Sequence, residues 1–257
     1  MASEKFDLCG LVKEQILHII SQKDFLTNTK LPSENQLALK LQVSRSTIRA
    51  VLANLENEGK VFRQHGSGTY VNPFAFSLDV TLSPKVYYTE LIRRSGYSPS
   101  IEILNVGTIR AGEIGPKLGL TPEDTVIEVK LIYKANDKLC IYCRNFLSGE
   151  HATDENLHTL GHEAVSIYIF LSQHLGISVK WDITKLIAVN GMDVKELASL
   201  ADSTSKSFKP FLLLESISYN QNNEPVMYSH SYVDTDLIKY HLVRRLYADE
   251  NPCEAGL

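Results

Sequence analysis

The chain has 257 residues, of which 44% are hydrophobic and 22% charged, as in an ordinary globular protein. This length favours two domains over one. No apolar run approaches the ~18 residues that a membrane-spanning helix needs, and the first ten residues lack the apolar centre of a signal peptide. The four cysteines show no disulfide spacing. We therefore expect a cytoplasmic protein that makes no membrane contact.

The charge is divided unevenly along the chain. Residues 1–76 carry nine Lys and Arg against seven Asp and Glu, a net charge of +2, whereas residues 77–257 carry 17 against 23, a net charge of −6. A basic N-terminal part joined to an acidic remainder is typical of a nucleic-acid-binding module attached to a different domain.

Three helical patterns follow one another near the N-terminus. The second begins at Ser33, which forms a capping box with Gln36, and the third begins at Ser44. Apolar residues at helical spacing mark the inner faces of the first and third helices: Val12, Ile16, Ile19 and Ile20, then Ile48, Val51, Leu52 and Leu55. Because only two residues separate the second helix from the cap of the third, the pattern predicts a helix-turn-helix.

The start of the third helix carries the residues expected to read DNA. Arg45, Ser46 and Arg49 point away from its apolar stripe, where a recognition helix meets base edges. An Arg there can bond both O6 and N7 of guanine. The free amides at the helix starts, together with Ser33 and Ser44, can bind phosphates.

A β-hairpin is predicted directly after these helices. Two short runs, Lys60–Gln64 and Thr69–Val71, flank the turn His65-Gly66-Ser67-Gly68. Glycines at its tip let the backbone approach a phosphate or a minor groove. The N-terminal part is therefore interpreted as a winged helix-turn-helix.

The stretch from Leu31 to Val71 resembles the DNA-binding domain of GntR-type regulators. The resemblance implies DNA contacts at the family's positions, which here are Ser33, Arg45, Thr47, Arg49, His65 and Gly66. We add Asn35, Ser44, Ser46 and Gly68 from the reasoning above. Asn35 stands where family members commonly carry Arg; because Asn pairs with adenine and Arg favours guanine, the operator is expected to differ there.

The remainder of the chain contains an internal repeat. At an offset of 86 residues, Tyr133 falls on Tyr219 and Tyr142 on Tyr228. Each copy has a strand, a short helix and a hairpin, with predicted turns at Ala135–Lys138 and Gln221–Glu224. The leading strands and helices are Ile101–Arg110 with Glu113–Leu120, and Asp182–Asn190 with Val194–Leu200. Two such units predict an α+β domain with an antiparallel sheet of about six strands and helices on one face.

This repeat resembles the UTRA effector domain, of chorismate-lyase-like fold, in the HutC branch of the same regulators. The resemblance spans roughly Leu78 to Leu246 and rests on three marks: Arg94–Tyr97, Ser166–Tyr168, and Glu224-Pro225 followed by Tyr228, Tyr232 and Asp236. We expect a winged helix-turn-helix over residues 1–73, a linker over 74–83, a UTRA effector-binding and dimerisation domain over 84–247, and a tail over 248–257. The first helix of the UTRA domain is predicted to start at Ser83-Pro84 and end at Ser95-Gly96.

The resemblance also implies where a small effector binds. In sugar-phosphate sensors of the family, a Ser-x-Tyr pair at a helix start holds the phosphate, and Ser166 and Tyr168 match it. Leu131 and Tyr133 replace two arginines, and Cys143 replaces a glutamate, which removes strong bonds to an anion. A less charged or partly aromatic metabolite is therefore an alternative to a sugar phosphate. The expected contacts are Tyr97, Leu131, Tyr133, Cys143, Ser166, Tyr168, Glu215 and Tyr228.

Two functions from different classes follow. The first is a homodimeric, sequence-specific regulator, more specifically a repressor that a small effector releases from double-stranded operator DNA. The second is an enzyme of lyase-like fold fused to a DNA-binding head. The chain has none of the Walker, GxSxG or HExxH motifs, and Cys140 and Cys143 lack the second pair that a zinc site needs. We therefore expect no catalytic residues, metal or cofactor, and favour the regulator.

Overall fold

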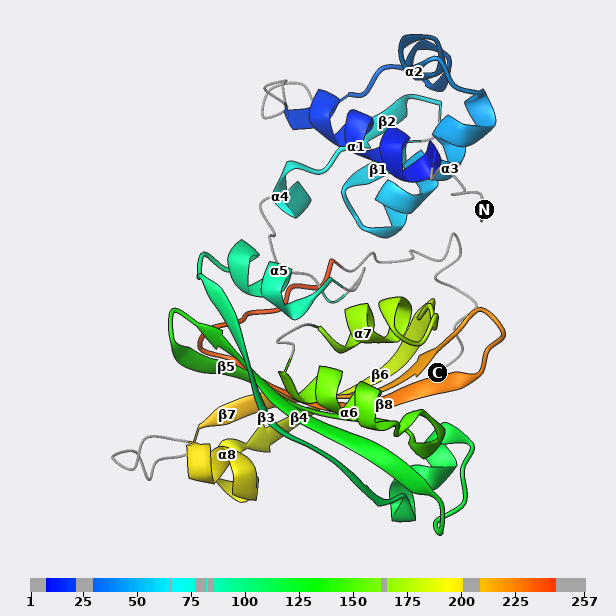
Figure 1. The fold of residues 1–257 in the computed structure, drawn as a ribbon. Helices are drawn as coiled ribbons and strands as arrows, with labels where there is room; N and C mark the ends of the chain where they lie inside the picture. Colours follow the sequence, from blue (N-terminus) through cyan, green and yellow to red (C-terminus); the bar gives the residue numbers. More distant parts are fainter. Residues whose placement is uncertain are drawn as a thin grey trace, which may run out of the picture. The chain divides into compact units, whose positions relative to one another are not determined.

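The computed structural model describes residues 8–21, 30–64, 66–76, 82, 86–162, 166–200 and 209–243. The chain forms two compact units, each visible in Figure 1. The head unit comprises residues 1–85 together with 240–257, and the sheet unit comprises residues 86–239. None of the described helices is both long and apolar enough to cross a membrane.

Three helices form the core of the head unit: α1 (Leu8–Ser21), α2 (Glu34–Leu41) and α3 (Arg45–Asn57). Their inward residues are almost completely buried: Val12, Ile16, Ile20, Leu37, Ile48, Val51, Leu52 and Leu55. Both predicted caps are confirmed. The Ser33 hydroxyl accepts from the Gln36 amide at 3.3 Å, the Gln36 side chain accepts from the Ser33 amide at 2.8 Å, and Ser44 accepts from the Thr47 amide at 3.1 Å.

The turn between α2 and α3 and the hairpin after α3 complete the winged helix-turn-helix. Gln42 ends α2 with a left-handed backbone, and the Val43 amide donates to the Ala38 carbonyl at 3.1 Å. Strands β1 (Val61–Gln64) and β2 (Gly68–Val71) pair antiparallel, as predicted. His65, at the tip, lies outside the described residues.

The sheet unit contains one antiparallel sheet of six strands in the order β3-β4-β5-β8-β7-β6. The strands are β3 (Pro99–Arg110), β4 (Thr125–Ala135), β5 (Lys138–Ser148), β6 (Trp181–Asn190), β7 (Pro210–Tyr219) and β8 (Pro225–Asp234). The predicted repeat is confirmed, because β3-β4-β5 and β6-β7-β8 are equivalent runs that meet where β5 pairs with β8. Between β4 and β5, Asn136 and Asp137 both have positive φ, as a two-residue hairpin turn requires.

Side chains on neighbouring strands alternate between the two faces of this sheet. Leu131 pairs with Cys143 in register, and Tyr133 follows two residues after Leu131, so these three share one face, the Tyr133 face. Phe146 lies three residues after Cys143 on β5 and therefore points to the opposite face. It pairs with Glu128 on β4 and with Tyr228 on β8, so these three residues share the other face, the Tyr228 face. This division decides which predicted site residues lie together.

Helices cover both faces of the sheet (Figure 1). On the Tyr133 face, α5 (Tyr88–Arg94) brings the Tyr88 ring within 5.2 Å of the Tyr133 ring, and α7 (Ile167–Gln173) begins beside Tyr133. On the Tyr228 face, the 3₁₀ helix η1 (Gly112–Leu118) and helix α8 (Lys195–Leu200) each bury leucines against strand residues. Helix α6 (Asp154–His162) packs against β3, and short 3₁₀ turns η2 (Gly149–His151) and η3 (Gly191–Asp193) link elements.

The α+β fold class is confirmed, and two boundaries differ from the prediction. Helix α5 begins at Tyr88 and not at Ser83-Pro84, because Tyr87 has an extended backbone with ψ of 144°; Ser83 and Pro84 themselves lie outside the described residues. A short helix, α4 (Pro73–Phe76), occupies the start of the predicted linker. The expected boundaries at 73, 83 and 247 remain predictions.

Candidate functional site

The start of α3 presents two arginines to solvent. Because Ile48, Val51, Leu52 and Leu55 turn the other side of α3 into the core, Arg45 and Arg49 are left with 64% and 65% of their side chains exposed. Ser46 is exposed beside them, and its hydroxyl lies 2.7 Å from that of Ser44. The structure thus brings the predicted base-reading side chains together on one open surface.

A third arginine, not predicted from the sequence, joins this surface. Glu34, the first residue of α2, lies 3.9 Å from a guanidinium nitrogen of Arg45, 3.8 Å from one of Arg49 and 3.9 Å from one of Arg63 on β1. Arg63 also lies 3.6 Å from Glu56, so three guanidiniums and two carboxylates leave a net charge of +1. Exposed ion pairs of this length contribute little to stability, so Glu34 holds the arginines near one another without neutralising them.

The other predicted DNA contacts surround this cluster. Ser33 and Asn35 are exposed at the start of α2, and Thr47 is half-buried in the first turn of α3. Gly66 and Gly68 are exposed at the hairpin, with φ of 70° and 127° that glycine adopts without strain. Both helix starts and the hairpin therefore contribute to a single candidate surface.

In the sheet unit, three predicted effector contacts lie together on the Tyr133 face. Ser166 is the N-cap of α7, and its side chain makes no hydrogen bond to the helix backbone but one to the Tyr133 side chain. Tyr168, the second residue of α7, is half-buried with its ring centroid 6.3 Å from that of Tyr87. Burial raises the pKa of Tyr133, so its hydroxyl stays protonated and can donate a hydrogen bond.

Leu131 and Cys143 form the adjoining part of the same face. Both are buried, and the Cys143 thiol lies 3.5 Å from the Ser231 hydroxyl. Their side chains carry no charge, so this part of the site favours an apolar or weakly polar group. Cys140, the other cysteine of the CxxC pair, is also a free buried thiol, whose pKa burial raises to about 12; such a thiol is a poor nucleophile.

Two of the predicted effector contacts, Glu215 and Tyr228, lie on the opposite face of the sheet. The Tyr228 hydroxyl donates to Glu215 at 2.8 Å and lies 2.7 Å from His230 Nε2. Strand alternation therefore separates both residues from Tyr133 and Ser166. Tyr97 is half-buried in the loop between α5 and β3.

Glu215 and Tyr228 belong instead to a polar cluster across the middle strands. Arg144 bonds both through Nε, at 2.8 Å, and through Nη2, at 2.6 Å, to one oxygen of Glu128, whose side chain is only 7% exposed. Burial raises the pKa of Tyr228 and lowers that of His230. Most of its polar atoms are paired within the cluster and stabilise the sheet, but among the described residues the buried Nδ1 of His230 has no hydrogen-bond partner.

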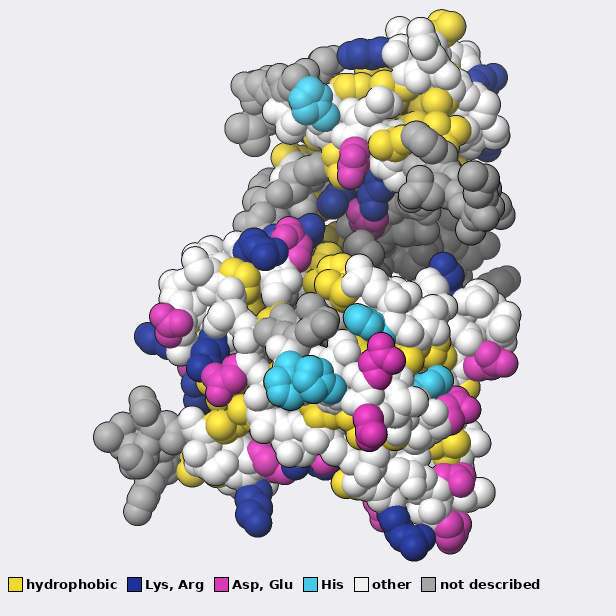
Figure 2. Space-filling view, viewed as in Figure 1, with side chains coloured by type: hydrophobic (Ala, Val, Ile, Leu, Met, Phe, Trp, Pro, Cys, Tyr) yellow, Lys and Arg dark blue, Asp and Glu magenta, His cyan; other side chains and the backbone are white. Residues whose placement is uncertain are grey.

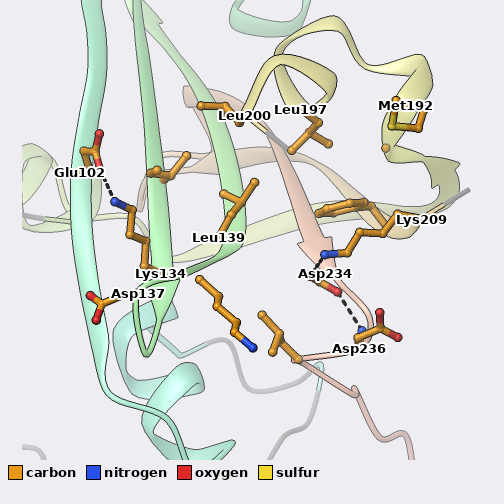
Figure 3. Close-up of a pocket in the computed structure, with 15 residues that line it drawn as sticks. Glu102, Lys134, Asp137, Leu139, Met192, Leu197, Leu200, Lys209, Asp234 and Asp236 are labelled. Atoms are coloured by element: carbon orange, nitrogen blue, oxygen red, sulfur yellow. Dashed lines mark hydrogen bonds and ion pairs between the residues drawn. The ribbon is translucent and has the colours of Figure 1, made fainter. Parts of the chain in front are cut away.

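A cavity of about 700 Å³ opens on the Tyr228 face beside α8 (Figure 3). Its apolar wall is formed by Ile132, Leu139, Leu197, Leu200 and Phe211. Two of its lysines are neutralised, because Lys134 lies 2.5 Å from Glu102 and Lys209 lies 2.6 Å from Asp234. None of the predicted effector contacts lines this cavity.

One face of the sheet unit carries charges of both signs. On the face shown in Figure 2, its described lysines, arginines, aspartates and glutamates are interspersed. A mixed surface does not produce the broad positive potential that attracts a nucleic acid. The arginine cluster of the head unit is therefore the stronger candidate for DNA binding.

Two family models match this chain. Residues 10–71 match the bacterial regulatory proteins of the gntR family, and residues 94–239 match the UTRA domain. The second match alone covers more than half of the chain. The protein therefore belongs to the UTRA-domain family, and its head unit matches the gntR family of bacterial regulatory proteins.

Individual relatives agree with this assignment. The chain is 34% identical over 128 residues to the HTH-type transcriptional regulator YurK of Bacillus subtilis, covering 49% of this chain and 52% of YurK. It is 28% identical over 127 residues to the HTH-type transcriptional repressor NagR of the same organism, covering 49% and 51%. Each alignment thus spans about half of the relative. Both relatives are described as transcriptional regulators.

A solved structure shows the same fold over nearly the whole chain. The possible transcriptional regulator YydK of Bacillus subtilis superposes with a TM-score of 0.66 at 17% identity, covering 92% of this chain and 99% of YydK. The two proteins therefore share this fold.

Proposed function

We propose that the protein is a homodimeric repressor that binds a two-fold symmetric operator and leaves it when a small effector binds the UTRA domain. The observation that carries the proposal is the exposed cluster of Arg45, Arg49 and Arg63 at the start of α3 and on β1. Two recognition helices are needed to read two half-sites, so two copies of the chain act together. The related repressor NagR supports repression as the mode of regulation.

The proposed DNA contacts divide into two kinds. Arg45 and Arg49 read base edges in the major groove, and each exchanges its long ion pair with Glu34 for bonds to guanine. The remaining positions, Ser33, Asn35, Ser44, Ser46, Thr47, His65, Gly66 and Gly68, bind phosphates or neighbouring base edges and fix the orientation of the head. Asn35 is the contact that favours adenine.

The proposed effector site is the part of the Tyr133 face under α7. Tyr133, Ser166 and Tyr168 supply hydroxyls and rings, and Leu131 and Cys143 supply an uncharged wall. A polar group of the ligand replaces the Tyr133 hydroxyl as the partner of Ser166. This chemistry suits a small metabolite with an aromatic or weakly polar body better than a sugar phosphate, which would need the two missing guanidiniums.

Effector binding regulates DNA binding by favouring one state of the dimer. A ligand that binds one state more tightly shifts the population toward it, and a state with a different spacing or tilt of the two α3 helices no longer fits both half-sites. All of these contacts are made in the cytoplasm, where operator DNA and metabolites are both present.

The effector site is tested by a metabolite screen that uses thermal shift, followed by operator-release titrations. For an effector found this way, Tyr133→Phe is expected to raise the concentration needed for half-release roughly three- to tenfold, because one hydrogen bond is lost. Tyr228→Phe removes the same atom from the opposite face and is the matched control, expected to leave that concentration unchanged. An effector that stabilises the protein without releasing DNA, or that is chemically converted, would overturn the proposal.

A further inference from the structure

Strand β6 is an edge of the six-stranded sheet, and no other strand of the described residues pairs with its outer side. It lies at the end of the strand order, and most of its residues are exposed. Its large apolar side chains are exposed by 42% at Trp181, 56% at Ile183, 51% at Leu186 and 38% at Ile187. Ile183 and Ile187 lie on the Tyr228 face and Leu186 on the Tyr133 face, since Lys185 pairs with Glu215. Apolar surface is thus exposed on both sides of one strand.

The opposite edge of the sheet is protected in ways that β6 lacks. Helix α6 packs against β3, and β3 has a bulge between Ile103 and Asn105. In contrast, β6 pairs with β7 in continuous register from Trp181 to Asn190 and contains neither Pro nor Gly. Natural proteins protect edge strands with bulges, prolines, charges or covering helices. Strand β6 carries two charged residues, Asp182 and Lys185, but it is regular and exposes several large apolar side chains, which is typical of a strand that pairs with another strand.

Alternate backbone positions of β6 are not used in its pairing with β7. The Gly191 amide donates to the Lys209 carbonyl at 2.8 Å, continuing the pairing of β6 with β7. Since hydrogen-bonded pairs alternate along an antiparallel ladder, the odd-numbered residues of β6 bond to β7. The amides and carbonyls of Thr184, Leu186, Ala188 and Asn190 therefore point outward from the edge.

We propose that β6 is the dimer seam, pairing antiparallel with β6 of a second copy to join the two sheets into one of twelve strands. This inference rests on the proposed homodimer and names its interface. A second copy fits because it offers an identical open edge, and because β6 carries one acid, Asp182, and one base, Lys185, so two copies do not repel. A two-fold axis relates antiparallel strands directly, which gives a closed dimer.

The charge pattern selects the register of this pairing. An axis at Lys185 would set that lysine opposite its own copy, and like charges directly opposite are destabilising. Moving the axis to Leu186 keeps residues 182–190 paired, places Leu186 against its own copy and sets Lys185 opposite the partner's Ile187. The seam then buries Leu186, Ile183 and Ile187 from both copies.

This seam lies in line with the proposed effector site. Leu186 pairs in register with Leu214, Leu214 with Ser231, and Ser231 with Cys143. Three strand spacings, roughly 14 Å, separate Leu186 from Cys143. A ligand that displaces Cys143 can therefore affect the seam through the paired residues Ser231, Leu214 and Leu186 on consecutive strands of one sheet.

The register is tested by disulfide trapping in a full-length Cys9→Ser, Cys253→Ser background. Leu186→Cys is expected to give a covalent dimer on mild oxidation, because residues on the axis lie within bonding distance of their own copies. Ile183→Cys is the matched control: it is equally exposed but lies six residue positions from its own copy across the seam, and it should stay monomeric on a denaturing gel. Equal crosslinking of both variants, or none of Leu186→Cys, would overturn the register.

The seam itself is tested by analytical ultracentrifugation of Leu186→Glu. Two carboxylates facing each other on the axis are expected to weaken dimerisation at least tenfold, with unchanged circular dichroism because the residue is exposed. A Leu186→Glu protein that remains as dimeric as the wild type would place the interface elsewhere. Operator binding and effector release by the wild type are measured separately, so the proposed function can stand even where this seam fails.

Discussion

Replacing Arg45 and Arg49 together by alanine is expected to reduce operator affinity by roughly 30-fold or more. Each arginine that forks onto a guanine contributes about 1–3 kcal/mol of discrimination, and both side chains are exposed and held near one another by Glu34. The head should remain folded, because these exposed ion pairs contribute little to stability. Fluorescence anisotropy with operator DNA at fixed salt measures the change.

The sheet unit offers a matched control for this double variant. Arg93 and Arg94 on α5 also share one carboxylate, Glu90, at 3.4 Å and 2.9 Å. Arg93→Ala with Arg94→Ala removes the same two charges from a surface that we do not place on DNA, and operator affinity should change little. If both double variants lost affinity equally, a general effect of net charge would replace the assigned reading surface.

Arg144→Ala is expected to destabilise the UTRA domain by about 3 kcal/mol. The substitution leaves the buried Glu128 carboxylate without its two bonds of 2.6 Å and 2.8 Å, and uncompensated buried charges are costly. Lys130 lies 3.7 Å from Glu128 and compensates only in part. At roughly 2–4 °C per kcal/mol for a domain of this size, thermal melting should shift downward by about 6–12 °C.

Two further variants separate the buried pair from its surroundings. Lys130→Ala removes a neighbouring charge but keeps the Arg144–Glu128 bonds, so it should lower the melting temperature by no more than a few degrees. Arg144→Met combined with Glu128→Leu removes both charges and is expected to restore most of the stability. A single Arg144→Ala variant that melts with the wild type would show that the pair contributes nothing to the fold.

Local signals in the sequence predicted the head unit well. The capping box of Ser33 and Gln36, the cap at Ser44 and the apolar stripe of α3 each depend on residues within one or two turns, and the structure contains all three. The arginine of β1 was missed because Arg63 meets Glu34 only through the tertiary fold. A spacing of 29 residues carries no pattern that predicts such a contact.

The effector site was less predictable, because it depends on which face of a strand each residue occupies. The register of β4 with β5 shifts between Tyr133 and Lys134, close to the hairpin turn. A one-residue shift exchanges the two faces of a strand, and nothing in the sequence of the hairpin indicates it. The internal repeat predicted six strands correctly, yet it could not place Tyr228 and Glu215 away from Tyr133.

The most direct test of DNA binding through the head is the salt dependence of full-length protein on DNA from its own promoter region. We predict binding at low salt that weakens roughly a hundredfold or more between about 50 mM and about 200 mM, because lysines and arginines on phosphates release counterions. The Arg45→Ala, Arg49→Ala protein should bind more weakly with a similar slope, because we assign these two arginines to base edges and not to phosphates. Failure to bind any promoter fragment at low ionic strength, or a flat dependence on salt, would contradict the assignment.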